Sequence, residues 1–283
     1  MFRALGPELD DAGSSRGNTA AARSLNLMVA VDVQLSSTHA DWPTLREASL
    51  RAERAGFDAV WVFDHIAGVA LGGDRSLECF TWLGALAEAT STVELGVMVA
   101  NTWNRQIGTL AVAAASVSAI SGRRFLLGVG AGAAPNSRWA AEQHAVRAQL
   151  ENRLAERQAR VEELLDLTDE MWHPDRSDEY TTFLRPTPTP PRIVGVNSVA
   201  LSTIAGRRAE GINVAWGHPR RDEFLGAARD AAAGRPFLTT TWTMWSPGLT
   251  DPDHPTRREM DAAGLDRIIL VVIDGVDAFA EQL

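Results

Sequence analysis

The sequence predicts an α/β protein with the architecture of a (β/α)8 TIM barrel, formed by residues 25–283 as a single domain. Two observations lead to this prediction. Short apolar runs alternate with segments of helical pattern, and eight such pairs follow one another. The runs are continuous in apolar residues, which is typical of parallel strands buried on both faces. Residues 1–24 mix small and polar residues without periodicity, so we expect a mobile N-terminal tail there.

The strands are assigned to the apolar runs. In chain order they are expected at 25–33, 57–63, 93–101, 124–132, 192–197, 211–216, 236–245 and 267–273. The third and fourth are the clearest pair, because one helix-length segment separates them and a parallel return needs such a crossover. Both end in small residues, which leave space for a planar ligand at the strand C-termini, where this fold binds ligands.

The helices are assigned between the strands, at about 41–55, 77–90, 106–121, 136–172, 198–208, 222–233 and 256–263. Asp41 is a suitable N-cap for the first helix, and Gly56 and Gly122 are suitable ends for the first and third. Segment 136–172 is expected to be one long helix, because its apolar residues recur at roughly helical spacing up to Pro174. The glycine-containing loop 66–76 is a candidate mobile lid.

Composition excludes several classes of function. The net charge of -9 argues against nucleic-acid and anionic-membrane partners. Every basic residue is an arginine, so mechanisms that need a Schiff-base lysine or a Walker A lysine are ruled out. The single Cys79 suits a reducing compartment, and we expect a cytoplasmic protein without a membrane span. No histidine spacing indicates a metal site.

Four segments in barrel order resemble the bacterial luciferase-like monooxygenase superfamily. They are 55–65 (AGFDAVWVFDH), 95–99 (LGVMV), 121–132 (SGRRFLLGVGAG) and 205–213 (AGRRAEGIN). The resemblance implies a barrel that binds either the deazaflavin coenzyme F420 or FMN at the C-terminal mouth of its strands, usually as a homodimer. It covers roughly residues 25–216.

Within that superfamily the F420-dependent branch is the more similar. Luciferase carries an arginine in the fourth-strand motif that helps to hold the flavin phosphate, and Ala131 stands there in this chain. The pair Asp64-His65 at the end of the second strand also matches F420-dependent enzymes. The family's glucose-6-phosphate dehydrogenase has an acidic glutamate after the fourth-strand glycines. This chain has Ala133-Ala134 at that place, so we do not expect that activity.

His65 and Asp64 are the candidate catalytic residues. His65 follows a strand C-terminus, where catalytic side chains of this fold concentrate, and an imidazole titrates near neutral pH. The resemblance implies that it lies near the reacting face of the cofactor and positions substrate or moves a proton. Asp64 is expected to fix the tautomer of His65 or to contact the cofactor. The open alternative is that both residues merely cap the loop.

The candidate cofactor contacts are Met98, Val99, Asn101, Gly130, Ala131, Gly132, Gly195, Val196, Asn197 and Ser198. The resemblance implies a cis peptide bond between Met98 and Val99, with an ordinary trans bond as the alternative. The run from Gly195 to Ser198 joins a strand end to a helix start, where N–H groups and the helix dipole suit a phosphate. Ser198 is equally suited to be a plain N-cap, and the glycines to be packing residues.

The sequence therefore predicts an F420-dependent oxidoreductase that transfers a hydride between the deazaflavin ring and a small, largely apolar organic substrate. Two alternatives remain open at this point. One is an FMN-dependent monooxygenase supplied with reduced flavin by a separate reductase, and the other is a barrel that binds a cofactor without catalysing a reaction.

Overall fold

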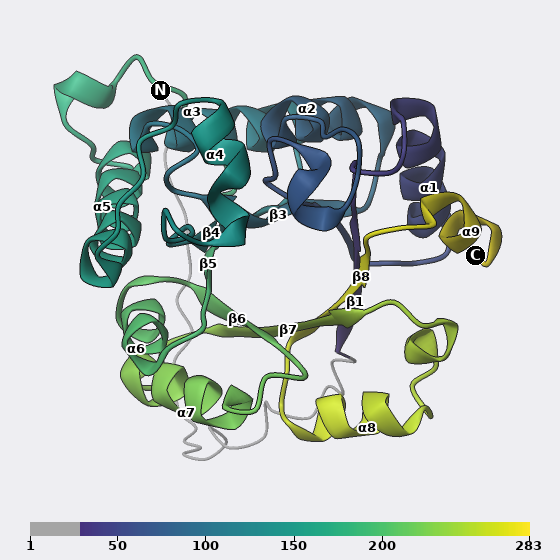
Figure 1. Cartoon of the computed structure of the whole chain (residues 1–283). Helices are drawn as coiled ribbons and strands as arrows, with labels where there is room; N and C mark the ends of the chain where they lie inside the picture. The colour runs from purple at the N-terminus through teal and green to yellow at the C-terminus, as the bar shows by residue number, and fades with distance from the viewer. Residues whose placement is uncertain (1–28) are drawn as a thin grey trace, which may run out of the picture.

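Eight parallel strands close into a barrel in which each strand pairs with the next and β8 pairs with β1 (Figure 1). The structure, a computed structural model, describes residues 29–283, so the predicted tail at 1–24 lies outside the described residues. The strands are β1 Ala30–Leu35, β2 Ala59–Val62, β3 Glu94–Asn101, β4 Phe125–Gly130, β5 Arg192–Gly195, β6 Gly211–Ala215, β7 Leu238–Met244 and β8 Arg267–Val272. The predicted barrel is confirmed.

Helices surround the barrel and cover the outer face of the strands (Figure 1). They are α1 Trp42–Arg54, α2 Cys79–Ala89, α3 Ile107–Ser121, α4 Ala141–Ala145, α5 Leu154–Trp172, α6 Val199–Arg208, α7 Arg221–Ala232, α8 Pro255–Ala262 and α9 Val276–Glu281. Four short 3-10 turns, η1 Gly68–Leu71, η2 Arg138–Ala140, η3 Asp178–Tyr180 and η4 Pro247–Thr250, lie in the loops. Asp41 caps α1 as expected, and Gly122 ends α3 with a φ of 62°.

Several predicted boundaries differ from the observed ones by one or two residues, and two differences bear on the site. The first strand runs to Leu35 and pairs along its whole length with β8, whereas the sequence pattern placed its end at residue 33. The expected long helix 136–172 is interrupted, because Arg147 has a φ of 58° after α4 and α5 begins only at Leu154. This break separates α4, which lies beside η1 over the strand ends, from α5, which packs on the barrel (Figure 1).

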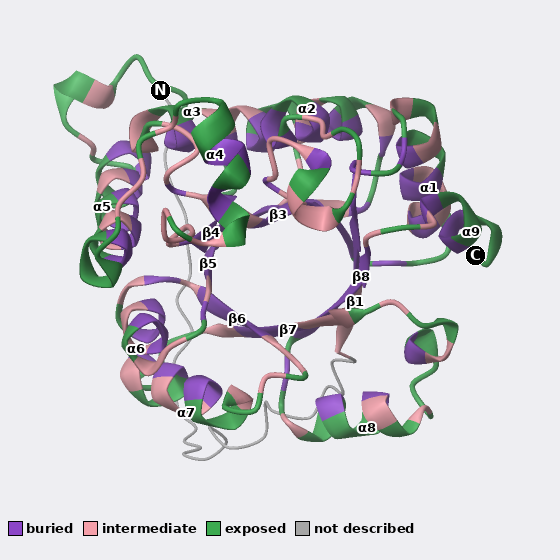
Figure 2. Cartoon of the chain, in the orientation of Figure 1, coloured by how far each residue is buried: buried purple, intermediate pink, exposed green. Residues whose placement is uncertain are grey.

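The apolar core has two parts, one on each face of the barrel wall. Figure 2 shows the strands buried along most of their length and the exposed residues on the outer surfaces of the helices. The larger part fills the space between strands and helices. The smaller part lies inside the barrel and consists of Ala59, Trp61, Met98, Leu126, Ile193, Ile269 and Val271. Successive residues of a strand point to opposite faces, which explains this division.

Charged side chains close the N-terminal end of the barrel interior. Arg267 donates two hydrogen bonds to the buried carboxylate of Asp32, at 2.8 and 2.9 Å, and Trp61 Nε1 donates a third at 2.8 Å. Arg267 also lies 2.7 Å from a carboxylate oxygen of Glu94. This network of ion pairs and hydrogen bonds occupies the N-terminal end, so the opposite, C-terminal end is the one that remains for a ligand. None of the described helices has the length and apolarity needed to cross a membrane.

Candidate active site

The C-terminal mouth of the barrel has an apolar floor. Phe63, Val99, Trp242 and Ile273 pack on the interior core but remain partly exposed, and all four lie in or just after the C-terminal halves of their strands. They come from the ends of β2, β3, β7 and β8, so they line one side of the barrel axis. Such a floor suits the face of a planar organic ring.

His65 stands at the edge of this floor and is held by a carboxylate that is distant in sequence. Its Nδ1 lies 2.9 Å from Oε1 of Glu142 on α4, 77 residues further along the chain. The other carboxylate oxygen of Glu142 accepts hydrogen bonds from the backbone N–H groups of Ile66 and Ala67, at 2.9 and 3.0 Å. Glu142 therefore fastens α4 to the start of the loop that carries His65.

Glu142 is ionised in this environment. Its burial raises the pKa, but the hydrogen bonds from His65, Ala67 and Ile66 together outweigh burial and hold the pKa of Glu142 below its usual value. Only 3% of the residue is exposed. Glu142 is not evident from the sequence, in which residues 136–172 read as one long helix, whereas α4 is a short separate one.

Asp64 does not contact the imidazole of its neighbour His65. Its carboxylate accepts two hydrogen bonds from Arg105, both 2.8 Å long, and a third from the backbone N–H of Asn101 at 2.8 Å. The thiol of Cys79 lies 3.1 Å away. The expectation that Asp64 fixes the tautomer of His65 is therefore wrong, since Glu142 makes that contact. A contact of Asp64 with the cofactor stays a prediction.

Side chains alternate in direction along an extended segment, which explains why those of Asp64 and His65 point apart. Trp61 and Phe63 point into the barrel while Val60 and Val62 pack against the helices. His65 continues the first set and Asp64 the second, so Asp64 faces α2. The carboxylates of Asp64 and Glu78 and the thiol of Cys79 lie close enough to hold a metal ion. The guanidinium of Arg105, which contacts all three, already supplies a positive charge there.

Aromatic rings flank His65. The ring centroid of Phe63 lies 5.9 Å from that of His65, and Trp139, which follows β4 on η2, lies 6.3 Å from it. Trp139 is 38% exposed and carries the guanidinium of Arg138 over its ring at 4.2 Å. The surroundings of His65 are thus polar on the Glu142 side and aromatic elsewhere.

The peptide bond between Met98 and Val99 is cis, as the family resemblance implied. It coincides with an irregularity in the pairing of β3 with β4 between Val97 and Ala100. The side-chain amide of Gln34, inside the barrel, donates to the carbonyl oxygen of Met98 at 2.7 Å. The side chain of Val99 is partly buried against the interior core at the mouth.

The glycines of the predicted cofactor site make room for neighbouring side chains. A Cβ on Gly130 would lie 2.5 Å from a methyl carbon of Val99, and a Cβ on Gly195 would lie 2.8 Å from the other methyl carbon. Gly132 has a φ of 73°, and a Cβ there would lie 2.6 Å from the side-chain oxygen of Asn101. The packing role is confirmed for these glycines, and contact with a cofactor stays a prediction.

The predicted phosphate loop has the geometry of a capped helix start. Ser198 Oγ accepts a hydrogen bond from the backbone N–H of Leu201 at 3.3 Å, and Gln158 donates to the same oxygen at 3.2 Å. The N-cap role of Ser198 is therefore confirmed. Val196 is buried against the helices, so only its backbone faces a ligand, and Ala131 is partly buried in the same outer core. Phosphate binding stays a prediction.

A second group of polar residues at the mouth was also missed. Gln143 donates to the side-chain oxygen of Asn104 at 2.9 Å, and Asn104 donates to the backbone carbonyl of Asp64 at 2.9 Å. This chain of contacts joins α4 to the loops after β2 and β3. The run of polar residues at 101–106 directly after a strand C-terminus is the signal that would have indicated it.

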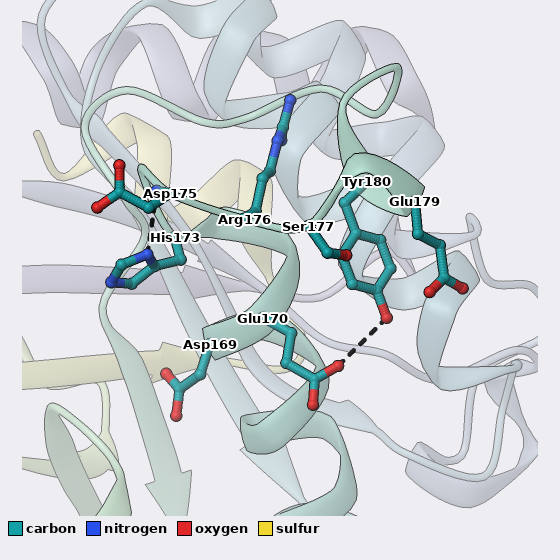
Figure 3. A pocket seen from close by; sticks show the side chains of 8 residues that line it. All are labelled: Asp169, Glu170, His173, Asp175, Arg176, Ser177, Glu179 and Tyr180. Atoms are coloured by element: carbon teal, nitrogen blue, oxygen red, sulfur yellow. Dashed lines mark hydrogen bonds between the residues drawn. The ribbon is translucent and has the colours of Figure 1, made fainter.

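The pocket drawn in Figure 3 is distant from this site. It has a volume of ≈ 430 Å³ and lies at the C-terminal end of α5, on the side from which β5 enters the barrel. Its lining is mainly charged, and the hydroxyl of Tyr180 donates to Glu170 within it (Figure 3). It contains no residue from a strand C-terminus, so we do not assign the reaction to it.

The chain is similar in sequence to a family model and to known proteins. The chain matches the model of the family described as luciferase-like monooxygenase over residues 24–238. It is 31% identical to an F420-dependent glucose-6-phosphate dehydrogenase of Amycolatopsis mediterranei over 177 residues, which are 59% of this chain and 51% of the relative. A protein of the same name from Nakamurella multipartita is 31% identical over 211 residues, 68% of this chain and 59% of the relative. The chain therefore spans between half and three-fifths of the length of these relatives.

Among solved structures, an F420-dependent secondary alcohol dehydrogenase in complex with an F420-acetone adduct superposes with a TM-score of 0.69. The identity is 17%, and the match covers 90% of this chain and 98% of the other. At this identity the likeness concerns the fold.

Proposed function

The chain belongs to the luciferase-like monooxygenase family, and from this premise we propose that it is an F420-dependent oxidoreductase. We propose further that it transfers a hydride between the deazaflavin ring and a small, largely apolar organic substrate. The curated relatives named above are F420-dependent. The observation that carries the proposal is the position of His65 at the edge of an apolar floor formed by strand C-termini.

The mouth offers groups that fit a heterocyclic cofactor. Besides the apolar floor, two buried polar atoms at this end, Nε1 of Trp103 and Oε1 of Gln143, have no hydrogen-bond partner among the described residues. One is a donor and the other an acceptor, so a ring system with both carbonyl and N–H groups would satisfy them. A purely hydrocarbon ligand would leave both unsatisfied.

Within this proposal each predicted residue has a task. The Met98-Val99 bulge, Asn101 and the backbone from Gly130 to Gly132 would lie against the ring, and the N-terminus of α6 with Gly195, Asn197 and Ser198 would receive a phosphate. When bound, the cofactor supplies the ring carbon that accepts or gives the hydride. The protein orients the two reactants and excludes water, and His65 holds or moves a proton beside them.

The substrate is proposed to be largely apolar because of the side chains around His65. Phe63, Trp139 and Trp242 present aromatic surface at the mouth. The glutamate that follows the fourth-strand glycines in the glucose-6-phosphate dehydrogenases is replaced by Ala133-Ala134. We therefore do not transfer the substrate of those relatives to this chain.

We also propose a cytoplasmic homodimer. The outer faces of α2 and α3, which pack side by side, carry no charge except Glu88, and Val112 and Ile120 are 37% and 58% exposed on α3. An uncharged, small-residue face on two adjacent helices suits a second copy of the chain. Sedimentation equilibrium measures the oligomeric state. A wild-type dimer that becomes monomeric with Val112→Arg supports the proposal, and a monomeric wild type contradicts it.

The activity is tested by turnover in two assays on the same preparation. The first follows the absorbance of F420 without oxygen, with a panel of small apolar alcohols and ketones. The second follows oxygen uptake with chemically reduced FMN. Consumption of F420 in the first assay, with no oxygen uptake in the second beyond that of reduced FMN without protein, supports the proposal. The reverse result would assign the chain to the FMN-dependent monooxygenases.

A further inference from the structure

The buried carboxylate of Glu142 and the partly exposed imidazole of His65 form a pair that ties two loops of the mouth together. We propose that Glu142 is the positioning residue of the site: it holds His65 with a proton on Nδ1 and so leaves Nε2 as the nitrogen that accepts a proton in the mouth. This inference rests on the proposed function for its catalytic meaning, although its structural content stands alone.

The donors around Glu142 determine the tautomer. The backbone N–H groups of Ile66 and Ala67 are donors, and the side-chain amide of Gln143 donates to Oε1 at 3.2 Å. An ionised carboxylate has only acceptors. Burial raises the pKa of Glu142, but the hydrogen bonds with His65, Ala67 and Ile66 outweigh burial and hold that pKa low. The 2.9 Å contact with His65 Nδ1 is therefore a hydrogen bond in which Nδ1–H donates.

The free nitrogen follows from this tautomer. In a neutral imidazole only one nitrogen carries a proton, so a protonated Nδ1 makes Nε2 an acceptor. Nδ1 faces α4, and Nε2 has no hydrogen-bond partner among the described residues. The ring is also confined by Phe63 and Trp139, which limit its rotation. His65 is thus prepared to take a proton rather than to give one.

The backbone contacts of Glu142 give it a second effect on His65. Because Oε2 binds the N–H groups of the two residues that follow His65, the carboxylate fixes the loop at the same time as the ring. Residues 66 and 67 lead into η1, and the hydroxyl of Ser76 at the far end of the loop donates to the carbonyl of His65 at 2.7 Å. The loop proposed as a lid is therefore fastened at both ends around His65.

Glu142→Gln is the decisive variant, since it keeps the size and shape of the side chain. The amide oxygen can still accept from Ile66 and Ala67, while the amide nitrogen can only donate to Nδ1. The proton of the neutral ring must then move to Nε2. We propose to record long-range 15N–1H spectra of the imidazoles at alkaline pH without cofactor, with His65 assigned by its loss in His65→Ala.

The expected result is a protonated Nδ1 in wild type and a protonated Nε2 in Glu142→Gln. The control is Glu170→Gln, a carboxylate on α5 that binds the hydroxyl of Tyr180 far from the mouth, and it leaves the spectrum of His65 unchanged. A wild-type His65 with its proton on Nε2 would overturn the proposal even if Glu142→Gln failed to fold.

Kinetics then separate this inference from the proposed function. If the protein is active with F420, Glu142→Gln should lower kcat on the order of 10²-fold, which is the lower end of the rate loss expected when a general base is removed. The KM should stay within about threefold of the wild-type value. An unchanged kcat would overturn the positioning role and leave the function intact. The expected tautomers together with no F420 turnover in wild type would support the positioning and contradict the function.

Discussion

The guanidinium of Arg105 donates two hydrogen bonds of 2.8 Å to the carboxylate of Asp64, and this pair joins the end of β2 to the loop after β3. The side chain of Asp64 is 2% exposed and that of Arg105 is 15% exposed. Arg105 also reaches Glu78 at the start of α2, at 2.9 Å. The aspartate beside the candidate catalytic histidine is thus part of the structural frame of the mouth.

Removing this charge pair is expected to cost stability. Asp64→Asn leaves Arg105 without its bidentate partner in a largely buried position, so the free energy of unfolding should fall by about 3 kcal/mol. Adding Arg105→Met should recover part of this loss, because the double variant buries no unpaired charge. Urea unfolding measures both. Full stability of Asp64→Asn together with lost cofactor binding would indicate instead that Asp64 contacts the cofactor.

Replacing the histidine should affect turnover far more than folding. His65 is partly exposed, and its ring contacts are with Phe63, Trp139 and Glu142. His65→Ala is expected to unfold at nearly the wild-type urea concentration and to lower kcat by about 10²- to 10⁴-fold. Steady-state kinetics with F420 check this. Wild-type turnover of His65→Ala would remove His65 from the reaction.

The close packing of Gly130 on Val99 gives a test of the mouth's shape. Gly130→Ala puts a methyl group 2.5 Å from Val99 Cγ2, so it should destabilise the protein by about 1–3 kcal/mol. When Gly130→Ala is combined with Val99→Ala, the free energy of unfolding should fall by less than the sum of the decreases in the two single variants. Gly84→Ala on α2, where nothing lies within 4 Å, is the matched control and should be neutral or stabilising. Strict additivity of the pair would contradict the contact.

Acid unfolding should report the pair of Arg192 and Glu210. Burial raises the pKa of Glu210. The guanidinium of Arg192 donates hydrogen bonds of 2.6 and 2.8 Å to the two carboxylate oxygens, and these bonds and its charge outweigh burial and leave the pKa below its usual value. A carboxyl with a lowered folded pKa stabilises the fold above its unfolded pKa of about 4.3 and loses that effect as the pH falls through the folded value.

Glu210→Gln should therefore be less stable than wild type by a constant amount above about pH 5, and the difference should shrink below about pH 4. Urea unfolding across this range measures this difference, with Glu259→Gln at an exposed position of α8 as the control. A difference that grows on acidification would contradict the sign of the shift.

The sequence predicted the barrel because its strands are encoded locally. Continuous apolar runs such as 93–101 and 124–132, ended by small residues, are distinctive of parallel strands, and the structure places β3 and β4 within them. Asp41 was predicted as a cap for the same local reason, whereas for Ser198 the N-cap was one of two open interpretations and the structure confirms it. The prediction of one helix over 136–172 was wrong because the apolar spacing persists across the non-helical residues between α4 and α5. The positive φ of Arg147, which follows α4, has no signature in the sequence.

The candidate site was predicted only in part, because its decisive contact is not local. His65 was identified from its place after a strand, but the partner of its Nδ1 comes from α4, whose sequence Ala141–Ala145 reads as an ordinary polar helix. Asp64 was assigned the wrong contact because adjacency in sequence was taken as adjacency in space. The alternation of Trp61 and Phe63 with Val60 and Val62 already indicated that Asp64 and His65 point to opposite faces.

The most direct test of the account is the affinity of the purified protein for F420 and, separately, for FMN. Each is measured by titration, following the fluorescence of the cofactor, with wild type and His65→Ala side by side. We expect a saturable complex with F420, with a Kd on the order of micromolar or tighter, and much weaker binding of FMN. Saturable binding of FMN alone, or of neither cofactor by a correctly folded protein, would contradict it.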